Sequence, residues 1–231
     1  MRILAADIAE FRAAQAAIGS LALADVRDFW DLLDLGRPEA ARNALLEVVP
    51  AVTTQWGEVS AAQAAEWYGD MRSTVGVPGS FRPVMGATAA VEWVQRQVRF
   101  GAQHLFTNNP AQMLLFLEGP VVRYTLEGGR NTIIESVAAD PQAVGWQRIA
   151  RPDACKFCRF LMSNGAVYKT ADTASFAAHQ DCKCVAIQSW DAGAPEVPAR
   201  VYEASKRTSG MSPKQRARHR SNIRDYLADM K

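Results

Sequence analysis

All four cysteines of this chain fall within one short stretch. Cys155 and Cys158 are separated by two residues, and His179, Cys182 and Cys184 follow in a second short segment. A C-x2-C knuckle followed by a second close group of Cys or His side chains is the ligand spacing of a tetrahedral zinc site, because each close pair closes a small chelate ring around the metal. Five candidates compete for four places: Cys155, Cys158 and Cys182 are the best placed, and the fourth stays open between His179 and Cys184.

Two other uses of the cysteines fit the pattern less well. Reduced thiols that merely fill a core would not all fall in one stretch, and disulfide frameworks belong to short secreted chains. The first residues, Met1 to Ala6, show no basic and long apolar signal peptide. We therefore expect one structural zinc ion, with a fold that has lost the metal but kept the ligands as the main alternative.

Four short segments around the cysteines occur in a characteristic order: Trp146-Gln147-Arg148, Pro152-Asp153-Ala154-Cys155-Lys156-Phe157-Cys158, Asn164-Gly165-Ala166-Val167-Tyr168 and His179-Gln180-Asp181-Cys182-Lys183-Cys184. Taken together they resemble the C-terminal signature of the phage Mu F-like minor head proteins, especially the actinobacteriophage branch, over roughly residues 144 to 190. Family members often have a proline after the histidine, where this chain has Gln180; this changes the stiffness of the turn and not a ligand.

This resemblance implies a function and a location. It implies a minor capsid (head) structural protein of a tailed bacteriophage, in the head interior or at the portal vertex, that assists head assembly, DNA packaging or DNA ejection. The partners it implies are the portal protein, the major capsid protein or both. During assembly the protein is expected in the bacterial host cytoplasm.

Charge divides the chain at the start of the cysteine segment. Residues 1–150 hold 12 Arg, no Lys and 16 acidic residues, a net charge of −4, whereas residues 151–231 hold 14 Lys+Arg and 8 acidic residues, a net charge of +6. No apolar run approaches the roughly 20 residues that a membrane-spanning helix needs, so no membrane partner is expected. We expect a helical region at 1–140, a Cys/His module at 141–195 and a basic C-terminal tail at 196–231.

The first region reads as successive helices. Apolar residues recur at steps of three and four from Ile8 to Leu33, which predicts one long helix or a pair broken near Gly19. Gly36 and Pro38 mark its stop and the next start, and that second helix reaches about Arg72, with a break or kink expected at Pro50 because proline has no N–H to donate.

Farther along the helical region, a loop is expected at residues 77–83. A third helix follows, which carries Val91, Val94, Val98 and Phe100, and a fourth is expected to end at Gly128-Gly129. Repeated apolar stripes of this kind favour a helical bundle.

The helical pattern of apolar residues ends near Pro141. Residues 145–149 and 184–190 read as short strands on either side of the cysteine segment. The fold class is therefore α+β and mostly α: a helical region, a small zinc-knuckle-like α+β module, and a basic C-terminal helix or tail. Such a module is too short to bury a large core, so metal binding would supply part of its folding free energy.

The tail is strongly basic. Seven positive charges and no acidic residue occur between Lys206 and Arg224, a pattern that attracts a phosphate backbone without reading sequence. Ser212-Pro213 predicts an N-cap and a first helical turn. The same charge would also suit a solvated helix or an acidic protein surface. The candidate contacts to packaged double-stranded DNA are Lys206, Arg207, Lys214, Arg216, Arg218, Arg220 and Arg224.

Nothing in the sequence forms a complete active site, so we do not expect an enzyme. Asp172, Ser175 and His179 could be written as a triad, but close neighbours in sequence rarely assemble one, and His179 already has metal spacing. The alternative functions are a capsid maturation protease, an activity sometimes attributed to relatives in this branch, and an HNH-like nuclease. The nuclease needs a histidine outside the ligand set, and only His104 and His219 remain.

Overall fold

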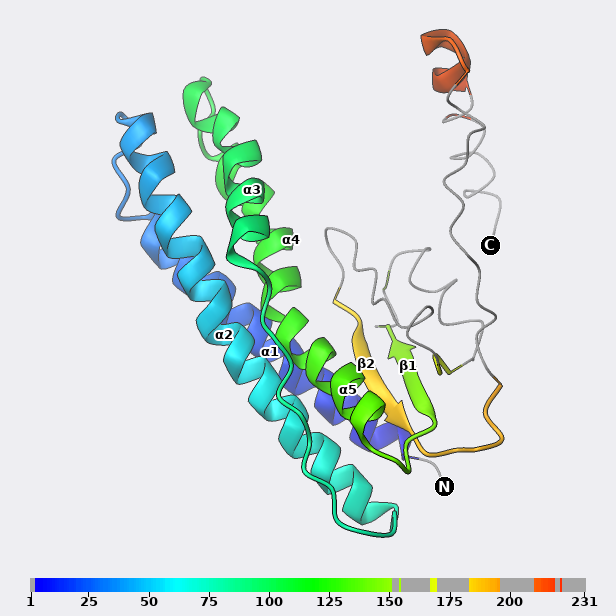
Figure 1. Ribbon diagram of the computed structural model, residues 1–231. Coiled ribbons are helices and arrows are strands. Elements are labelled where there is room, and N and C mark those ends of the chain that lie inside the picture. Colours follow the sequence, from blue (N-terminus) through cyan, green and yellow to red (C-terminus); the bar gives the residue numbers. More distant parts are fainter. Residues whose placement is uncertain are drawn as a thin grey trace. The chain divides into compact units, whose positions relative to one another are not determined.

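The computed structural model describes residues 3–150, 154, 167–169, 183–195, 210–218 and 221. The chain divides into two compact units, Met1–Val197 and Pro198–Lys231. Within the described residues, the first unit contains helices followed by a two-stranded antiparallel sheet (Figure 1). This confirms the expected α+β, mostly α, fold class.

Helix α1 spans Ala5–Trp30 without interruption, so the first apolar stripe forms one helix and not a broken pair. Gly19 lies buried in its middle, where an ideal Cβ would come within 3.0 Å of Val122 Cγ1. The glycine therefore allows α1 to lie close to α4 instead of ending the helix. Such close approach of two backbones is a common reason for glycine inside a helix.

Helix α2 spans Pro38–Thr74 and begins with Pro38 in its first turn, as expected. The break expected at Pro50 does not occur, because the helix continues through this residue. Pro50 cannot donate to the carbonyl of Leu46, and the side-chain Nε2 of Gln95 donates to that oxygen instead, at 3.3 Å. A side chain from α3 thus satisfies the acceptor that the proline leaves without a backbone donor.

The loop expected near residues 77–83 is present and continues as an extended segment to residue 90. Helix α3 follows at Val91–Gly101, then a short 3-10 helix, η1, at Ala102–Phe106, and helix α4 at Gln112–Thr125. Among the described helices, none is both long and apolar enough to cross a membrane.

The prediction that Gly128-Gly129 ends the fourth helix is wrong. Both glycines lie in the first turn of helix α5, Glu127–Ala139, which follows α4 after the single residue Leu126. An ideal Cβ on Gly128 would lie 2.2 Å from the carbonyl oxygen of Gly57, and one on Gly129 would lie 2.6 Å from Ser60 Oγ. The glycines are there because α5 crosses α2 at very short range.

The helices enclose one hydrophobic cluster. It contains side chains from α1, α2, α3, η1 and α4, and partly buried aromatic residues pack around it. The fully buried members include Ala22, Val26, Leu45, Val98, Met113, Leu117 and Val121. Ala22, Val26, Leu45 and Val98 come from apolar stripes expected from the sequence, whereas Met113, Leu117 and Val121 of α4 were not singled out there.

Strands β1, Gly145–Ile149, and β2, Val185–Ser189, pair antiparallel, with Gly145 opposite Ser189 and Ile149 opposite Val185. Both strands were expected from the sequence. Their side chains share a second hydrophobic cluster with the helices, in which Phe11 stacks on Trp67 with ring centroids 4.2 Å apart. The sheet is therefore attached to the helices through a common core, which also contains Trp146 and Ile187.

Candidate metal centre

The strand pairing brings together the two ends of the segment that carries the Cys and His residues. Because Ile149 pairs with Val185, residues 150 and 184 lie next to each other at the same end of the sheet. Cys155 lies five residues after Ala150, and Cys182 lies two residues before Cys184. Antiparallel pairing thus brings residue 150, which precedes the C-x2-C pair in the sequence, next to Cys184, which follows the second group of candidate ligands.

The middle of this segment is also held on the sheet. Trp146 and Tyr168 exchange backbone hydrogen bonds of 3.1 and 2.8 Å, and their rings stack at a centroid distance of 4.3 Å. Val167 is fully buried, and its N–H donates to the carbonyl of Pro195 at 2.8 Å. The described residues therefore hold this segment at its two ends, 150 and 184, and near its middle, at 167 and 168, a point that lies between Cys158 and His179 in the sequence.

The outer edge of β1 needs a glycine for this arrangement. An ideal Cβ on Gly145 would lie 2.3 Å from Val167 Cγ1 and 2.5 Å from the carbonyl oxygen of Tyr168. A side chain at this position would push residues 167–168 away from the strand. Trp146 and Tyr168, which belong to the segments that resemble Mu F-like proteins, thus pack against each other and hold residue 168 on β1.

Only one of the five candidate ligands, Cys184, belongs to the described residues. It is 2% exposed and lies immediately before β2. Cys155, Cys158, His179 and Cys182 lie outside the described residues, so the ligand geometry and the choice between His179 and Cys184 stay predictions. The donor set itself, thiolates and an imidazole at knuckle spacing, has the chemistry of a zinc site.

A buried cation next to the backbone of Cys184, Arg130, could not be recognised from the sequence. Its Nε donates to the carbonyl of Cys184 at 2.9 Å, and its Nη1 donates to the carbonyl of Arg123 at 3.0 Å. The side chain comes from α5 and is 3% exposed. Arg130 therefore fixes the backbone at Cys184 to the helices.

The opposite end of β2 is held by a buried carboxylate, Asp140. One oxygen, Oδ2, accepts from Tyr68 Oη at 3.0 Å, Arg72 Nε at 3.1 Å and Trp190 Nε1 at 3.2 Å. The other, Oδ1, accepts from the backbone N–H of Gln142 at 3.0 Å. Asp140 thereby joins the end of α2, the end of α5 and the end of β2.

The surroundings of Asp140 and Tyr68 shift the pKa values of both side chains. Burial alone would raise the pKa of Asp140, but the hydrogen bonds from Gln142, Arg72, Trp190 and Tyr68 outweigh it, so the pKa lies below its usual value. Burial, together with the negative charge of Asp140, raises the pKa of Tyr68 well above its usual value. At neutral pH the cluster is a carboxylate paired with a guanidinium and a neutral phenol.

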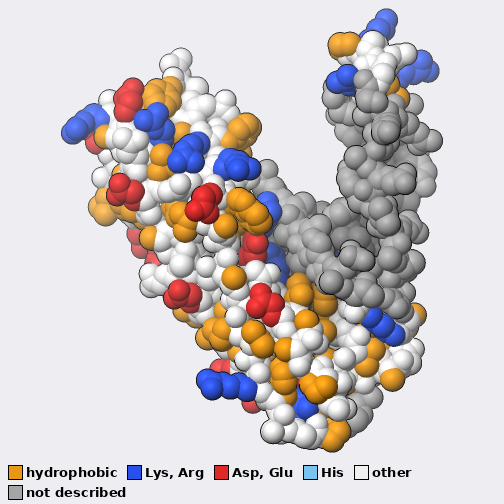
Figure 2. Space-filling model, in the orientation of Figure 1, with side chains coloured by type: hydrophobic (Ala, Val, Ile, Leu, Met, Phe, Trp, Pro, Cys, Tyr) orange, Lys and Arg blue, Asp and Glu red, His pale blue; other side chains and the backbone are white. Residues whose placement is uncertain are grey.

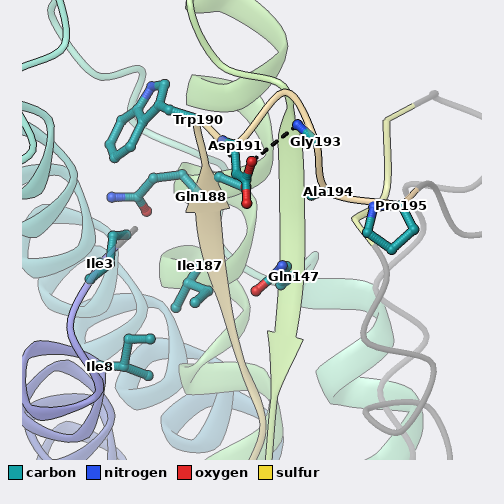
Figure 3. A pocket seen from close by; sticks show the side chains of 11 residues that line it. Ile3, Ile8, Gln147, Ile187, Gln188, Trp190, Asp191, Gly193, Ala194 and Pro195 are labelled. Atoms are coloured by element: carbon teal, nitrogen blue, oxygen red, sulfur yellow. Dashed lines mark hydrogen bonds between the residues drawn. The ribbon is translucent and has the colours of Figure 1, made fainter. Parts of the chain in front are cut away.

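A cavity of about 320 Å³ lies beside β2 and the start of α1 (Figure 3). Ile3, Ile8 and Ile187 contribute apolar side chains, and Asp191 is the single ionisable side chain among its lining residues. Asp191 Oδ1 accepts from the backbone N–H of Gly193 at 3.0 Å. A cavity with one ionisable group offers no acid and base pair, and we assign it no chemistry.

The candidate DNA contacts lie in the second unit. Lys214, Arg216 and Arg218 are exposed on a helical turn that spans residues 213–218, whereas Lys206, Arg207, Arg220 and Arg224 lie outside the described residues. The expected N-cap is present: Ser212 Oγ accepts from the N–H of Gln215 at 3.3 Å, and Gln215 Oε1 accepts from the N–H of Ser212 at 2.8 Å. This reciprocal pair is a capping box.

Comparison with known proteins relates the chain to a family. A family model described as VG15 protein matches residues 2–208, which includes the helices, the sheet and the Cys/His segment. No curated protein and no solved structure matches the chain. The match covers most of the chain, so it applies to the whole of the first unit and not to the cysteine pattern alone.

Proposed function

Because the chain belongs to the VG15 protein family, and so is of phage origin, we propose that it is a noncatalytic minor head protein of a tailed phage. In this proposal the protein sits in the head interior or at the portal vertex. There it contacts the portal protein, the major capsid protein or both, and assists head assembly, DNA packaging or ejection. The observation that carries the proposal is the Cys/His segment of Mu F-like pattern within a chain that matches a phage family over residues 2–208.

A structural zinc ion is part of this proposal. Four of Cys155, Cys158, His179, Cys182 and Cys184 would hold it, and the metal would supply folding free energy to a segment with little core of its own. The described residues support the site through its frame. The strand pairing holds the two ends of the segment together, the Trp146–Tyr168 contact holds its middle on β1, and Arg130 holds the backbone of Cys184.

The proposed DNA contact rests on the basic tail. Lys214, Arg216 and Arg218 are exposed in one helical turn, which Ser212 and Gln215 cap. Exposed positive charges of this kind attract phosphates. Packaged double-stranded DNA is the partner of matching charge that the head interior offers.

An assembly experiment tests the function. Heads produced without this protein should form with normal size and with processed capsid subunits, but should package or deliver DNA poorly. A plasmid copy of the natural gene should restore DNA delivery, and mass spectrometry of purified particles should find the protein in a few copies per head.

The same experiment separates the protease alternative. If the capsid precursor accumulates uncleaved without the protein, and if Ser175→Ala or His179→Ala reproduces this while the variant still enters heads, the structural role is wrong. A protein that is absent from purified particles would also overturn the proposal.

A further inference from the structure

An open groove runs along α2. It consists of two adjoining hollows of about 560 and 540 Å³. One lies between α2 and α3, and the other lies between α2 and the extended segment that precedes α3. Thr54, Glu58 and Val91 line both hollows, so the two form one continuous depression.

The wall opposite α2 is fixed before anything binds. Side chains of α5 hold the extended segment: Thr132 Oγ1 accepts from the N–H of Gly86 at 2.9 Å, and Asn131 Nδ2 donates to the carbonyl of Ala87 at 2.7 Å. The hydrogen bond from Gln95 to Leu46 ties α3 to α2 at the other end of the groove. A groove with fixed walls loses little conformational entropy when a partner binds.

The surface of the groove combines apolar side chains with carboxylates. Met85 and Val91 are 53% and 41% exposed, although both are large and hydrophobic. Glu47, Glu58 and Glu92 are exposed charges of the groove, and its lining contains no Lys, Arg or His. In Figure 2, hydrophobic and acidic side chains lie together over the middle of the helical part of the molecule.

The spacing of the carboxylates matches a helix. Glu47 and Glu58 are eleven residues apart on α2, which is about three helical turns and about 16 Å, so both side chains point to the same side. A second helix laid along the groove would meet both carboxylates with cations that are also about three turns apart on one face.

We infer that this groove binds a basic amphipathic helix of a partner protein. The apolar face of the helix covers Met85 and Val91, and its lysine or arginine side chains pair with Glu47, Glu58 and Glu92. This is the helix-in-groove mode of recognition, in which buried apolar area supplies affinity and rim charges supply orientation and rate. The inference depends on the described helices alone, and it stands whether or not the protein is a head component.

The test uses the full-length protein and a fluorescent 18-residue peptide of leucine and lysine, with the leucines on one helical face. Binding is measured by fluorescence anisotropy, and a photoreactive leucine maps the contact by mass spectrometry. We expect saturable binding with crosslinks at Met85 or Val91. The combined variant Glu47→Gln, Glu58→Gln and Glu92→Gln should weaken binding at least tenfold, and Met85→Ser with Val91→Ser at least fivefold.

Matched controls separate the groove from general charge attraction. The variant Glu10→Gln, Asp28→Asn and Glu135→Gln removes the same charge from exposed sites that do not line the groove, and it should change binding less than twofold. Circular dichroism should show the same helical content in all variants. Equal weakening by the two charge variants, equal binding of a scrambled peptide of the same composition, or tighter binding of a leucine and glutamate peptide or of a DNA duplex would overturn the inference.

Discussion

Two glycine-to-alanine substitutions on crossing helices should change stability in opposite directions. Gly128 lies on α5 against the backbone of α2, whereas an ideal Cβ on Gly69, also within α2, would meet no atom within 4 Å. Neither residue has a positive φ, so alanine fits the backbone conformation at both positions. The two substitutions add the same methyl group and differ only in what that group meets.

The size of each effect follows from the distances. In an open helical position, alanine is better than glycine by about 0.5–1 kcal/mol, because it restricts the unfolded chain. We therefore expect Gly69→Ala to raise the free energy of unfolding by about this amount. At Gly128 the new Cβ would lie 2.2 Å from the carbonyl oxygen of Gly57 and 3.0 Å from its carbon.

Backbone atoms cannot rotate away, so α2 and α5 must separate at this crossing. Overpacking of this kind costs about 1–3 kcal/mol. Since both partners here are backbone, we take the upper end, about 3 kcal/mol, and subtract about 1 kcal/mol of helix propensity. Gly128→Ala should thus be destabilising by about 2 kcal/mol.

Urea unfolding followed by circular dichroism at 222 nm measures both changes, with thermal unfolding as a second readout. For a chain of this size, about 2 kcal/mol corresponds to a fall in Tm of about 4–8 °C. If Gly128→Ala stabilises the protein as Gly69→Ala does, the close crossing of α2 and α5 is wrong. A destabilised Gly69→Ala variant would refute the reasoning from open space.

Three further outcomes follow from the described contacts and the sequence. Asp140→Ala leaves the Arg72 guanidinium, which is 7% exposed, without its carboxylate, and should lower the free energy of unfolding in urea by about 3–5 kcal/mol. Because folding lowers the pKa of Asp140, this loss relative to the natural protein should be full above about pH 4 and shrink as the pH falls below that value. A loss below about 1 kcal/mol would contradict the role given to Asp140. Cys155→Ser or Cys158→Ser should abolish the binding of one zinc ion per chain, as measured by elemental analysis, and should change tryptophan fluorescence while most of the helical signal persists. Natural protein that is purified without chelator and is folded, reduced and free of metal would exclude the site. Replacing Lys214, Arg216, Arg218 and Arg220 with Gln should reduce the slope of log K for duplex DNA against log salt by about 3–4, and binding that is sequence-specific or survives the change would argue against backbone contact.

Local chemistry in the sequence determined where most elements begin and end. The apolar spacing from Ile8 to Leu33, Pro38 at a helix start, and the short segments around Trp146 and Ile187 were enough to place α1, α2, β1 and β2. The capping box at Ser212 is equally local. These features could be predicted because the residues that decide them are neighbours in the chain.

Tertiary structure alone decided the meaning of the residues that act across helices. Pro50 stays within a helix because Gln95 reaches the carbonyl of Leu46, and Gly128 serves a helix crossing because the backbone of Gly57 lies against it. The same holds for the two charges that support the sheet, since Asp140 and Arg130 reach partners far away in sequence. The spacing of the Cys and His residues is enough to indicate a zinc site. Only the pairing of β1 with β2 shows that residues 150 and 184, on either side of these residues, lie next to each other, because strand register depends on the shared core and not on nearby residues.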